Sequence, residues 1–379
     1  MKIVIAPDSF KQALTAQQVA TALYRGWSRV YPQADYQLVP MADGGEGTVQ
    51  SLIDATGGQR LEAIVSGPLG TPVHGFWGLL GDGKTAVIEM AAAAGLEYLS
   101  DSARDPMHAT TYGVGELIRS ALDHGVTHII LGLGGSATND AGAGMAEALG
   151  FRLLDDKGQK LARGGAALSR LASIDASAAD RRLAKTRVDL ASDVTNPLTG
   201  EHGASAVFGP QKGATPNQVR LLDKALARFA AVVRRDLAID VENQPGAGAA
   251  GGLGAGGLCF LNGHFQHGID LIIEETGLRQ TLRDASLVIT GEGKLDGQTL
   301  FGKTPIGVAR CAKQFGIPVI AFAGYLTPDA SSVYAHGIDA IFSITPGILS
   351  LPEALQSSAQ NLTRCAENTA RLWALASRV

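Results

Sequence analysis

Residues 285–305 read ASLVITGEGKLDGQTLFGKTP, an apolar strand followed by a glycine-rich loop and the proline-marked start of a helix. Residues 297–304 match the phosphate-binding pattern G-x-x-x-x-G-K-[ST], in which backbone N–H groups wrap a phosphate. A P-loop glycine follows its strand almost at once, whereas this strand is predicted to end at Thr290, well before Gly297. Pro305 favours Thr304 as the N-cap of the helix. The stretch therefore predicts a strand, loop and helix of an α/β fold without a P-loop.

The same order of elements occurs near the N-terminus. The apolar strand KIVIA precedes a polar loop and a helix, whereas from residue 60 several strands follow one another without helices between them. The first pattern predicts a parallel sheet and the second a mixed sheet. We therefore predict an α/β protein in which residues 1–60 and 285–379 form one domain and residues 61–284 an inserted one. The active site is expected in the cleft between these domains.

The composition is that of a globular protein without affinity for nucleic acid or membrane. The 379 residues carry a net charge of −4 and no basic run, so the electrostatic pattern of a nucleic-acid binder is missing. No apolar stretch approaches the ~18 residues of a membrane helix, and the N-terminal apolar run is too short for a signal peptide. The three widely spaced cysteines predict reduced thiols and a cytoplasmic location. A homodimer is left open.

Three loops combine glycines with carboxylates between a strand and a helix: residues 43–48, 132–140 and 291–303. Ligands of open α/β sheets gather at such strand ends, and free N–H groups at helix starts attract anions. In the second loop, Gly134, Gly135 and the N–H groups of Ser136 to Thr138 are placed to wrap phosphate oxygens. The alternative is that Thr138 or Asn139 caps the next helix. The glycine-rich tract at residues 246–257 favours close packing over a ligand role.

Carboxylates and lysines provide the remaining candidates. Asp193 closes the predicted strand VDLAS, where a carboxylate usually meets a ligand, with an Asx-turn as the alternative. Glu292 and Asp296 are four residues apart, so both could face one Mg²⁺, which takes one or two carboxylates plus phosphate oxygens and water; a solvated pair is the alternative. Lys11 and Lys212 lie in loops where a cation can meet an anion. The eight histidines show no metal-binding spacing and provide no candidate.

Six motifs occur in order along the chain: APDSFK, PMADGGEGT, GLGGSATND, SDVTNPL, FGPQKGA, and GEGKLDGQT followed by GKTP. Together they resemble the bacterial glycerate kinases of the two-domain, non-P-loop type, and the resemblance runs from Lys2 to the C-terminal helix. It implies a Rossmann-like domain with an inserted α/β domain, and transfer of the γ-phosphate of ATP to D-glycerate. Gln12 and Ala13 depart from the expected Gly and Ser, although the neighbouring Asp8, Ser9 and Lys11 are present.

The resemblance also implies roles for individual residues. Asp193 is the expected base, with Lys11 and Lys303 as further catalytic residues. Glu292 and Asp296 are expected at Mg²⁺, and the phosphates of ATP at Gly134, Gly135, Ser136 and Thr138. The residues expected at the substrate are Asp8, Ser9, Asp43, Lys212 and Asn196. The expected product is 2-phosphoglycerate, and the alternatives are a kinase of another small hydroxy acid or a non-catalytic two-domain protein that binds a small ligand.

Overall fold

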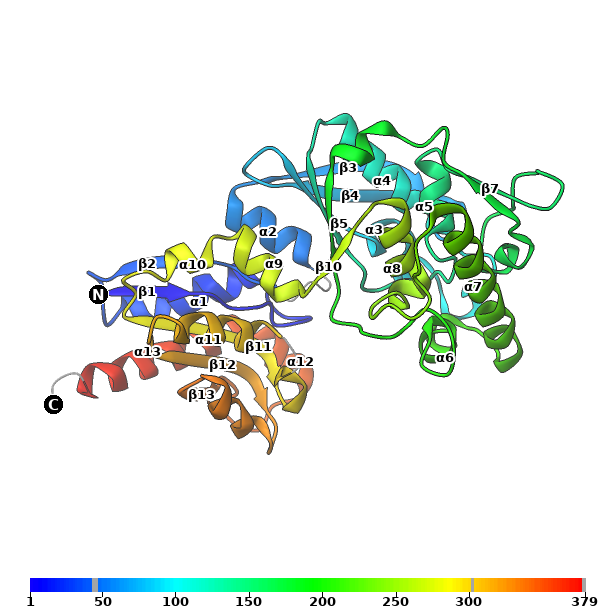
Figure 1. The fold of residues 1–379 in the computed structure, drawn as a ribbon. Helices are drawn as coiled ribbons and strands as arrows, with labels where there is room; N and C mark the ends of the chain where they lie inside the picture. Colours follow the sequence, from blue (N-terminus) through cyan, green and yellow to red (C-terminus); the bar gives the residue numbers. More distant parts are fainter. Residues whose placement is uncertain (43–46, 301–302, 377–379) are drawn as a thin grey trace. The chain divides into compact units, whose positions relative to one another are not determined.

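The computed structural model describes residues 1–42, 47–300 and 303–376, and the chain divides into two compact units (Figure 1). Unit 1 consists of Met1–Gly57 and Gly268–Val379, and unit 2 of Gly58–His267. The second boundary lies before helix α9 (Gly268–Glu275) and not at residue 285, because α9 packs on α11 (Thr304–Lys313) of unit 1. Glycine at position 307 permits this contact, since a Cβ there would lie 2.1 Å from the Ile269 side chain.

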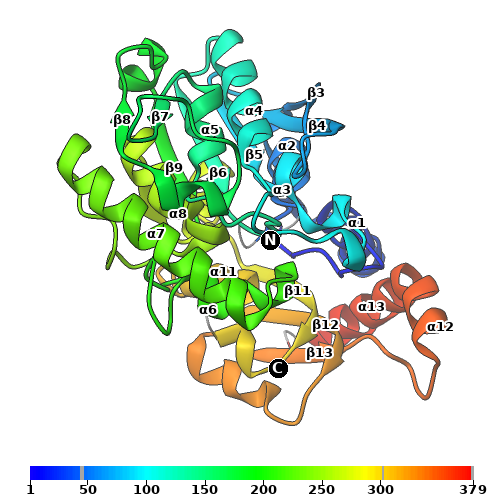
Figure 2. The same cartoon turned by 90° about the vertical axis from the view of Figure 1, so that its right-hand side faces the viewer.

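Unit 1 contains the parallel sheet that the sequence predicts, with five strands in the order β13-β12-β11-β1-β2. Figure 2 shows β11, β12 and β13 of this sheet next to one another. The connection through α1 leads from β1 to β2, and that through α11 leads from β11 to β12 in the opposite direction. The strand order therefore reverses between β1 and β11, and open α/β sheets bind their ligands at such a switch point. The strands are β1 (Lys2–Ile5), β2 (Asp35–Leu38), β11 (Leu287–Leu295), β12 (Val319–Leu326) and β13 (Ala340–Ser343).

Helices α1 (Ala16–Ser28) and α13 (Ser358–Ala376) pack side by side against this sheet. The first begins after Thr15, which forms a capping box with Gln18. Its apolar stripe, which includes Leu23 and Trp27, is buried against the strands and α13. The remaining helices of unit 1 are α2 (Thr48–Thr56), α10 (Leu278–Thr281) and α12 (Leu351–Gln356).

Unit 2 contains the mixed sheet that the sequence predicts, in the order β10-β9-β6-β5-β4-β3. Strands β5, β6, β9 and β10 are parallel, whereas β3 and β4 run antiparallel. The strands are β3 (Gln59–Ser66), β4 (Pro72–Leu79), β5 (Thr85–Glu89), β6 (His128–Gly132), β9 (Arg187–Ala191) and β10 (His264–Gln266), with a separate hairpin of β7 (Arg152–Leu154) and β8 (Ser173–Asp175). The helices are α3 (Ala91–Ala94), α4 (Tyr112–Asp123), α5 (Ala143–Ala148), α6 (Ala204–Phe208), α7 (Pro216–Leu237) and α8 (Ala249–Phe260).

Two strand ends differ from the sequence-based prediction. Strand β11 continues to Leu295, five residues beyond Thr290, because its backbone keeps pairing with β12 up to Leu326. Strand β9 ends at Ala191, so Asp193 follows the strand and does not close it. None of the helices in the described part of the chain combines the length and apolar character needed to span a bilayer.

Candidate active site

The switch point of unit 1 brings together two carboxylates that are distant in sequence. Asp8 follows β1, and Glu292 lies in the last part of β11, the neighbouring parallel strand. The backbone N–H of Asp8 donates to the carbonyl of Gly291 over 2.9 Å, which continues the strand pairing past the end of β1. Asp8 and Glu292 therefore lie at the same edge of the sheet, where ligands of this fold bind.

Each of these carboxylates accepts a hydrogen bond from a buried threonine. The Thr304 hydroxyl donates to Oδ2 of Asp8 over 2.6 Å, and the Thr299 hydroxyl donates to Oε1 of Glu292 over 2.5 Å. The N-cap of α11 is Lys303, so the prediction that Thr304 is the N-cap is wrong. The local preference for a threonine N-cap before a proline is not realised here, and the Thr304 hydroxyl instead donates a hydrogen bond to Asp8, which follows β1.

Lys303 lies beside the carboxylates of β11 and its loop. Its ammonium is 3.4 Å from Oε2 of Glu292 and 3.9 Å from Oδ1 of Asp296, and Asp296 also pairs with Lys294 at 2.9 Å. Glu292 is only 8% exposed, and this burial raises its pKa to about 7; the charge of Asp8 adds to the rise, while Thr299 and Lys303 oppose it. Glu292 can therefore gain or lose a proton near neutral pH, beside the ammonium of Lys303.

Mg²⁺ was expected at Glu292 and Asp296. Among the described residues, no group of three or more His, Cys, Asp or Glu side chains is arranged to hold a metal ion. An ion that arrives with a nucleotide needs fewer protein ligands, because phosphate oxygens and water occupy most of its coordination positions. Glu292 and Asp296, the two carboxylates beside Lys303, match the one or two protein ligands that such an ion needs.

Lys11 lies in a tight turn that starts after Asp8. Phe10 and Leu14 exchange two backbone hydrogen bonds across the turn, and Gln12 between them has a φ of 64°, in the region that favours glycine. The departure of Gln12 from the family glycine is therefore accommodated at the cost of some backbone strain. Among the described residues, none forms a hydrogen bond or ion pair with the Lys11 ammonium.

A cavity of about 470 Å³ lies beside this turn and is lined by Ser9 and Lys11, among others. The backbone N–H of Ser9 donates to Oδ1 of Asp8 over 2.6 Å, so the two predicted substrate residues are held together. Asp43 lies outside the described residues. The cavity is large enough for a small molecule, and the side chain of Lys11 lines it.

In unit 2, a buried lysine donates hydrogen bonds to the loop that follows β6. Lys212 is 1% exposed and donates to the Ser136 hydroxyl and to the Thr138 carbonyl, both over 2.7 Å. Burial lowers the pKa of Lys212 to about 7, while the carboxylate of Asp140 opposes this shift. Lys212, expected at the substrate, thus contacts the predicted phosphate loop itself. Gly134 and Gly135 remain exposed on this loop.

Two polar atoms of the same loop are buried without a hydrogen-bond partner among the described residues, the Thr138 hydroxyl and Oδ1 of Asn139. Buried polar atoms are rarely left unsatisfied, and a ligand or water is the usual partner of such an exception. The amide nitrogen of Asn139 donates to the Ser205 hydroxyl over 3.0 Å. The alternative in which either side chain caps α5 is wrong, because the N-cap is Gly142.

Asp140 was not singled out in the sequence, yet it is completely buried at this loop. Its carboxylate accepts hydrogen bonds from the backbone and hydroxyl of Thr111 at 2.8 and 3.0 Å, and from the N–H groups of Gly142 and Gly144 at 3.2 Å. Burial raises its pKa, and these hydrogen bonds oppose the rise. The sequence signal that could have identified Asp140 is its place as a carboxylate shortly before a short helix rich in Gly and Ala.

The glycine-rich tract packs closely against this loop, as predicted. A Cβ on Gly251 would lie 1.9 Å from the Thr138 carbonyl, and one on Gly256 would lie 2.5 Å from the Ala141 carbonyl. The start of α8 therefore needs glycine so that its backbone can support the loop.

Asp193 meets a histidine that the sequence did not indicate. Oδ1 of Asp193 lies 3.1 Å from Nδ1 of His267, and the two residues follow β9 and β10, which are parallel neighbours. Asp193 keeps 37% of its side chain exposed, so a substrate can reach it. Only the pairing of β9 with β10 could have revealed His267. Asn196 donates its amide to the His202 carbonyl over 2.8 Å, which orders the following turn.

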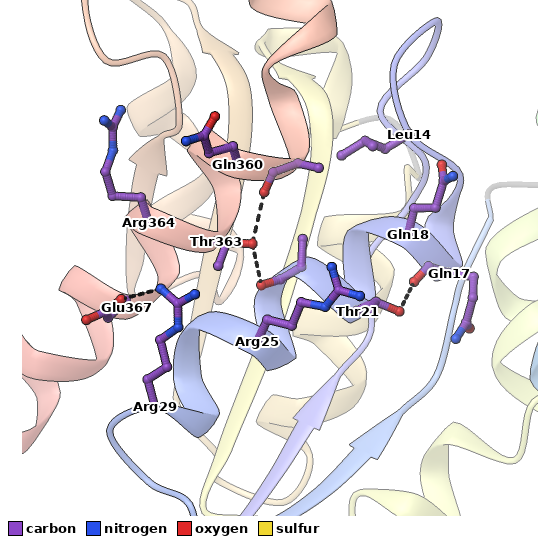
Figure 3. Close-up of a pocket in the computed structure, with 12 residues that line it drawn as sticks. Leu14, Gln17, Gln18, Thr21, Arg25, Arg29, Gln360, Thr363, Arg364 and Glu367 are labelled. Carbon is purple, nitrogen blue, oxygen red and sulfur yellow. Dashed lines mark hydrogen bonds and ion pairs between the residues drawn. The ribbon is translucent and has the colours of Figure 1, made fainter.

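A larger surface cavity of about 790 Å³ lies between α1 and α13 and contains none of the predicted site residues (Figure 3). Arg29 and Glu367 on its wall form an ion pair at 2.8 Å, and the Thr363 hydroxyl bonds to backbone carbonyls of both helices. The cavity runs along helices and not at strand ends, so its position does not favour an active site.

The strand ends of this protein carry a glycine loop, carboxylates and lysines. This combination is typical of an α/β phosphotransferase, which positions its substrates and neutralises the charge of the phosphates. The chain matches the model of the Glycerate kinase family over residues 3–374 and belongs to that family. Membership makes it a kinase with ATP as a substrate, as the sequence predicts, and does not favour a non-catalytic binding protein.

Proteins of known sequence and structure are similar over nearly the whole chain. The chain is 53% identical to a glycerate kinase of Bacillus subtilis, over 98% of this chain and 97% of the relative. It is 49% identical to the glycerate 2-kinase of Escherichia coli, over 100% and 99%. A crystal structure described as glycerate kinase 2 of Salmonella typhimurium superposes with a TM-score of 0.93 at 51% identity and covers 100% of both chains.

Proposed function

We propose that this protein transfers the γ-phosphate of ATP to the 2-hydroxyl of D-glycerate and releases 2-phosphoglycerate. The observation that carries the proposal is the 49% identity, over the full chain, to a relative named glycerate 2-kinase. The small cavity lined by Lys11 supports it, because an ammonium group suits the carboxylate of a hydroxy acid.

Asp193 is proposed as the base. A kinase needs a group that accepts or orients the proton of the attacking hydroxyl, and an accessible carboxylate at a strand end meets this need. His267 lies 3.1 Å from Oδ1 of Asp193 and helps to fix the orientation of the carboxylate. Asn196 orders the adjoining turn and, in this proposal, contacts glycerate.

The remaining residues bind anions. Lys11 and Lys303 neutralise the transferring phosphate or the glycerate carboxylate, and Asp8, Ser9 and Asp43 orient the hydroxyl groups of glycerate. The exposed N–H groups of Gly134 and Gly135, with Ser136 and Thr138, bind phosphate oxygens of ATP. Lys212 acts indirectly, because its ammonium holds the loop in shape. Glu292 and Asp296 would hold Mg²⁺, which supplies charge neutralisation at the phosphates when bound.

The test is a turnover assay with product analysis. Purified protein should form ADP from ATP only when D-glycerate and magnesium are both present, and NMR of the product should show the phosphate on the 2-hydroxyl. A panel of other small hydroxy acids is the control for substrate identity. Equal ADP formation without glycerate would contradict kinase activity on it, and faster turnover of another acid would assign a different substrate.

A further inference from the structure

The cavity of about 790 Å³ between α1 and α13 is a groove whose walls come from both helices (Figure 3). Its volume falls in the range of small-molecule sites, which is roughly 300–1,000 Å³. The two helices are in close contact beside it, because Gly26 has no side chain: a Cβ there would lie 2.5 Å from the Thr363 carbonyl. The Thr363 hydroxyl also bonds to the Ala22 carbonyl over 3.2 Å. These contacts fix the two helices, so the groove is formed before a ligand arrives.

The groove carries an excess of positive charge. Arg25, Arg29 and Arg364 line it, and Glu367 is the one carboxylate among the described residues on its walls. Glu367 is already shared between two arginines, since it pairs with Arg29 at 2.8 Å and with Arg371 at 2.7 Å. Its charge is therefore used within the protein and leaves the other two arginines of the groove without compensation.

These two arginines are Arg25 and Arg364. In the part of the chain that the structure describes, no residue forms a hydrogen bond or ion pair with the Arg25 guanidinium. Arg364 donates to the amide oxygen of Asn361 over 3.3 Å, a partner without charge. Arg25 belongs to α1 and Arg364 to α13, so each helix contributes one guanidinium to the groove.

Neutral side chains add hydrogen-bond donors to the same walls. Gln17 and Gln360 line the groove with their amides. Gln18 lines it as well, and its amide nitrogen remains for a ligand because its amide oxygen accepts from the backbone N–H of Thr15 over 2.9 Å. The carbon surfaces of the groove come from Leu14, Ala22 and Ala359. A ligand with several acceptor oxygens and a small organic body matches both kinds of surface.

We propose that this groove binds a small organic phosphate. A phosphate group carries about −1.5 to −2 charges and three acceptor oxygens, which suit two uncompensated guanidinium groups and the nearby amides better than a single carboxylate does. Guanidinium groups also bind phosphate oxygens in a bidentate manner. The groove is larger than a phosphate ion requires, so it has room for an organic part on the carbon surfaces.

The groove is next to the turn that carries Lys11. Leu14 and Gln18 line the groove and also line the cavity of about 470 Å³ that contains Lys11. Leu14 closes the turn, because its backbone exchanges two hydrogen bonds of 2.9 Å with Phe10. A ligand that contacts Leu14 can therefore alter the turn and the position of Lys11. The bound phosphate acts as an effector in this way, and this part of the inference rests on the proposed kinase function.

Calorimetry with phenyl phosphate tests the binding site, because this probe resembles neither D-glycerate nor a nucleotide. Arg25→Gln and Arg364→Gln each remove one guanidinium from an exposed position. Each should raise the Kd about 10- to 150-fold, the loss of one hydrogen bond to a charged group. Phenyl phosphate should also raise the melting temperature of the wild type, and this rise should shrink in both variants. Thermal melts without the probe report whether the variants fold.

Three controls separate the chemistry of the site. Arg283→Gln removes an exposed arginine of unit 1 that does not line the groove, so its Kd should equal that of the wild type. Benzoate has a carboxylate in place of the phosphate and should bind at least about tenfold more weakly. Saturating ATP should leave the binding of phenyl phosphate in place.

Four outcomes would contradict the proposal. Displacement of phenyl phosphate by ATP, or an equal Kd in the wild type and both groove variants, would place the probe elsewhere. Absence of binding of both phenyl phosphate and inorganic phosphate would show that the groove is no phosphate site. Equal binding of benzoate and phenyl phosphate would assign it to carboxylates.

Initial rates test the effector role. Saturating phenyl phosphate should change the KM for D-glycerate at least about fivefold in the wild type, the lower end of couplings between two sites, and should leave it unchanged in Arg25→Gln. If the probe binds through Arg25 and the KM stays the same, the effector role is wrong and the site stands. If the wild type makes no ADP with D-glycerate while binding depends on Arg25, the proposed function fails and the site again stands.

Discussion

At the residue scale, the proposed proton transfer depends on Asp193 and on its contact with His267. Asp193→Asn keeps the shape of the side chain but removes the charge and the basic oxygen, so kcat should fall by about 10²–10⁴-fold. The melting temperature should stay close to that of the wild type, because the side chain is partly exposed. Steady-state kinetics measures kcat, and a thermal melt measures the melting temperature.

Glu201→Gln is the matched control for this prediction. Glu201 is an exposed carboxylate in the same loop, and its neutralisation should leave kcat unchanged. A folded Asp193→Asn variant with a kcat within about tenfold of the wild type would show that another group accepts the proton.

Lys212 gives a second residue-scale prediction, for stability against pH. Its pKa in the folded protein is about 7, whereas that of an unfolded lysine is ~10.4, so the unfolded chain binds more protons between these values. The free energy of unfolding of the wild type should therefore rise with pH from about 7 to 10, by at most about 1.4 kcal/mol per unit, relative to Lys212→Met. Below pH 7 the difference should be flat.

Denaturant unfolding curves at several pH values measure this difference. Lys224→Met removes an exposed lysine from α7 and should run parallel to the wild type over the whole range. The carboxylate of Asp140 opposes the lowering of the Lys212 pKa, and burial raises the pKa of Asp140 itself. Parallel curves for the wild type and Lys212→Met would contradict burial of the lysine.

At the scale of elements, the first turn of α11 is tied to the end of β1. Thr304→Val removes the hydroxyl that donates to Asp8, so the protein should lose about 1.5–3 kcal/mol of stability, the contribution of a hydrogen bond to a charged group. Turnover should fall as well, since Asp8 loses a partner that orients it. Chemical denaturation and a turnover assay provide the two measurements.

Thr304→Ser is the control for this contact, because it keeps a hydroxyl at the same backbone position. It should retain most of the stability and activity. If Thr304→Val matched the wild type in both, the bond between α11 and Asp8 would have no role in the site.

At the scale of the whole molecule, each unit has its own sheet and its own buried core. Unit 2 is one continuous segment, so residues 58–267 expressed alone should fold with a cooperative thermal transition by circular dichroism. The isolated segment should not consume ATP with D-glycerate, because Lys11 and Lys303 belong to unit 1. The full chain at equal concentration is the positive control. An unfolded segment would show that unit 2 depends on unit 1, and an active one that unit 1 is dispensable.

Local patterns were sufficient to predict the α/β class and the parallel and mixed sheets. Strand and helix periodicity, capping residues and glycine loops act over a few neighbouring positions, so the sequence records them directly. The positions of candidate loops at strand ends followed from the same patterns. The order of six motifs along the chain then determined the family.

The tertiary structure alone decided which side chains meet. Thr304 reaches Asp8 across 296 positions of the chain, and His267 reaches Asp193 across 74. Lys212 was expected at the substrate, yet it is buried and donates a hydrogen bond to the Ser136 hydroxyl. Burial and long-range hydrogen bonds depend on how distant strands pair and pack, and a stretch of sequence carries no record of the partner that will lie against it.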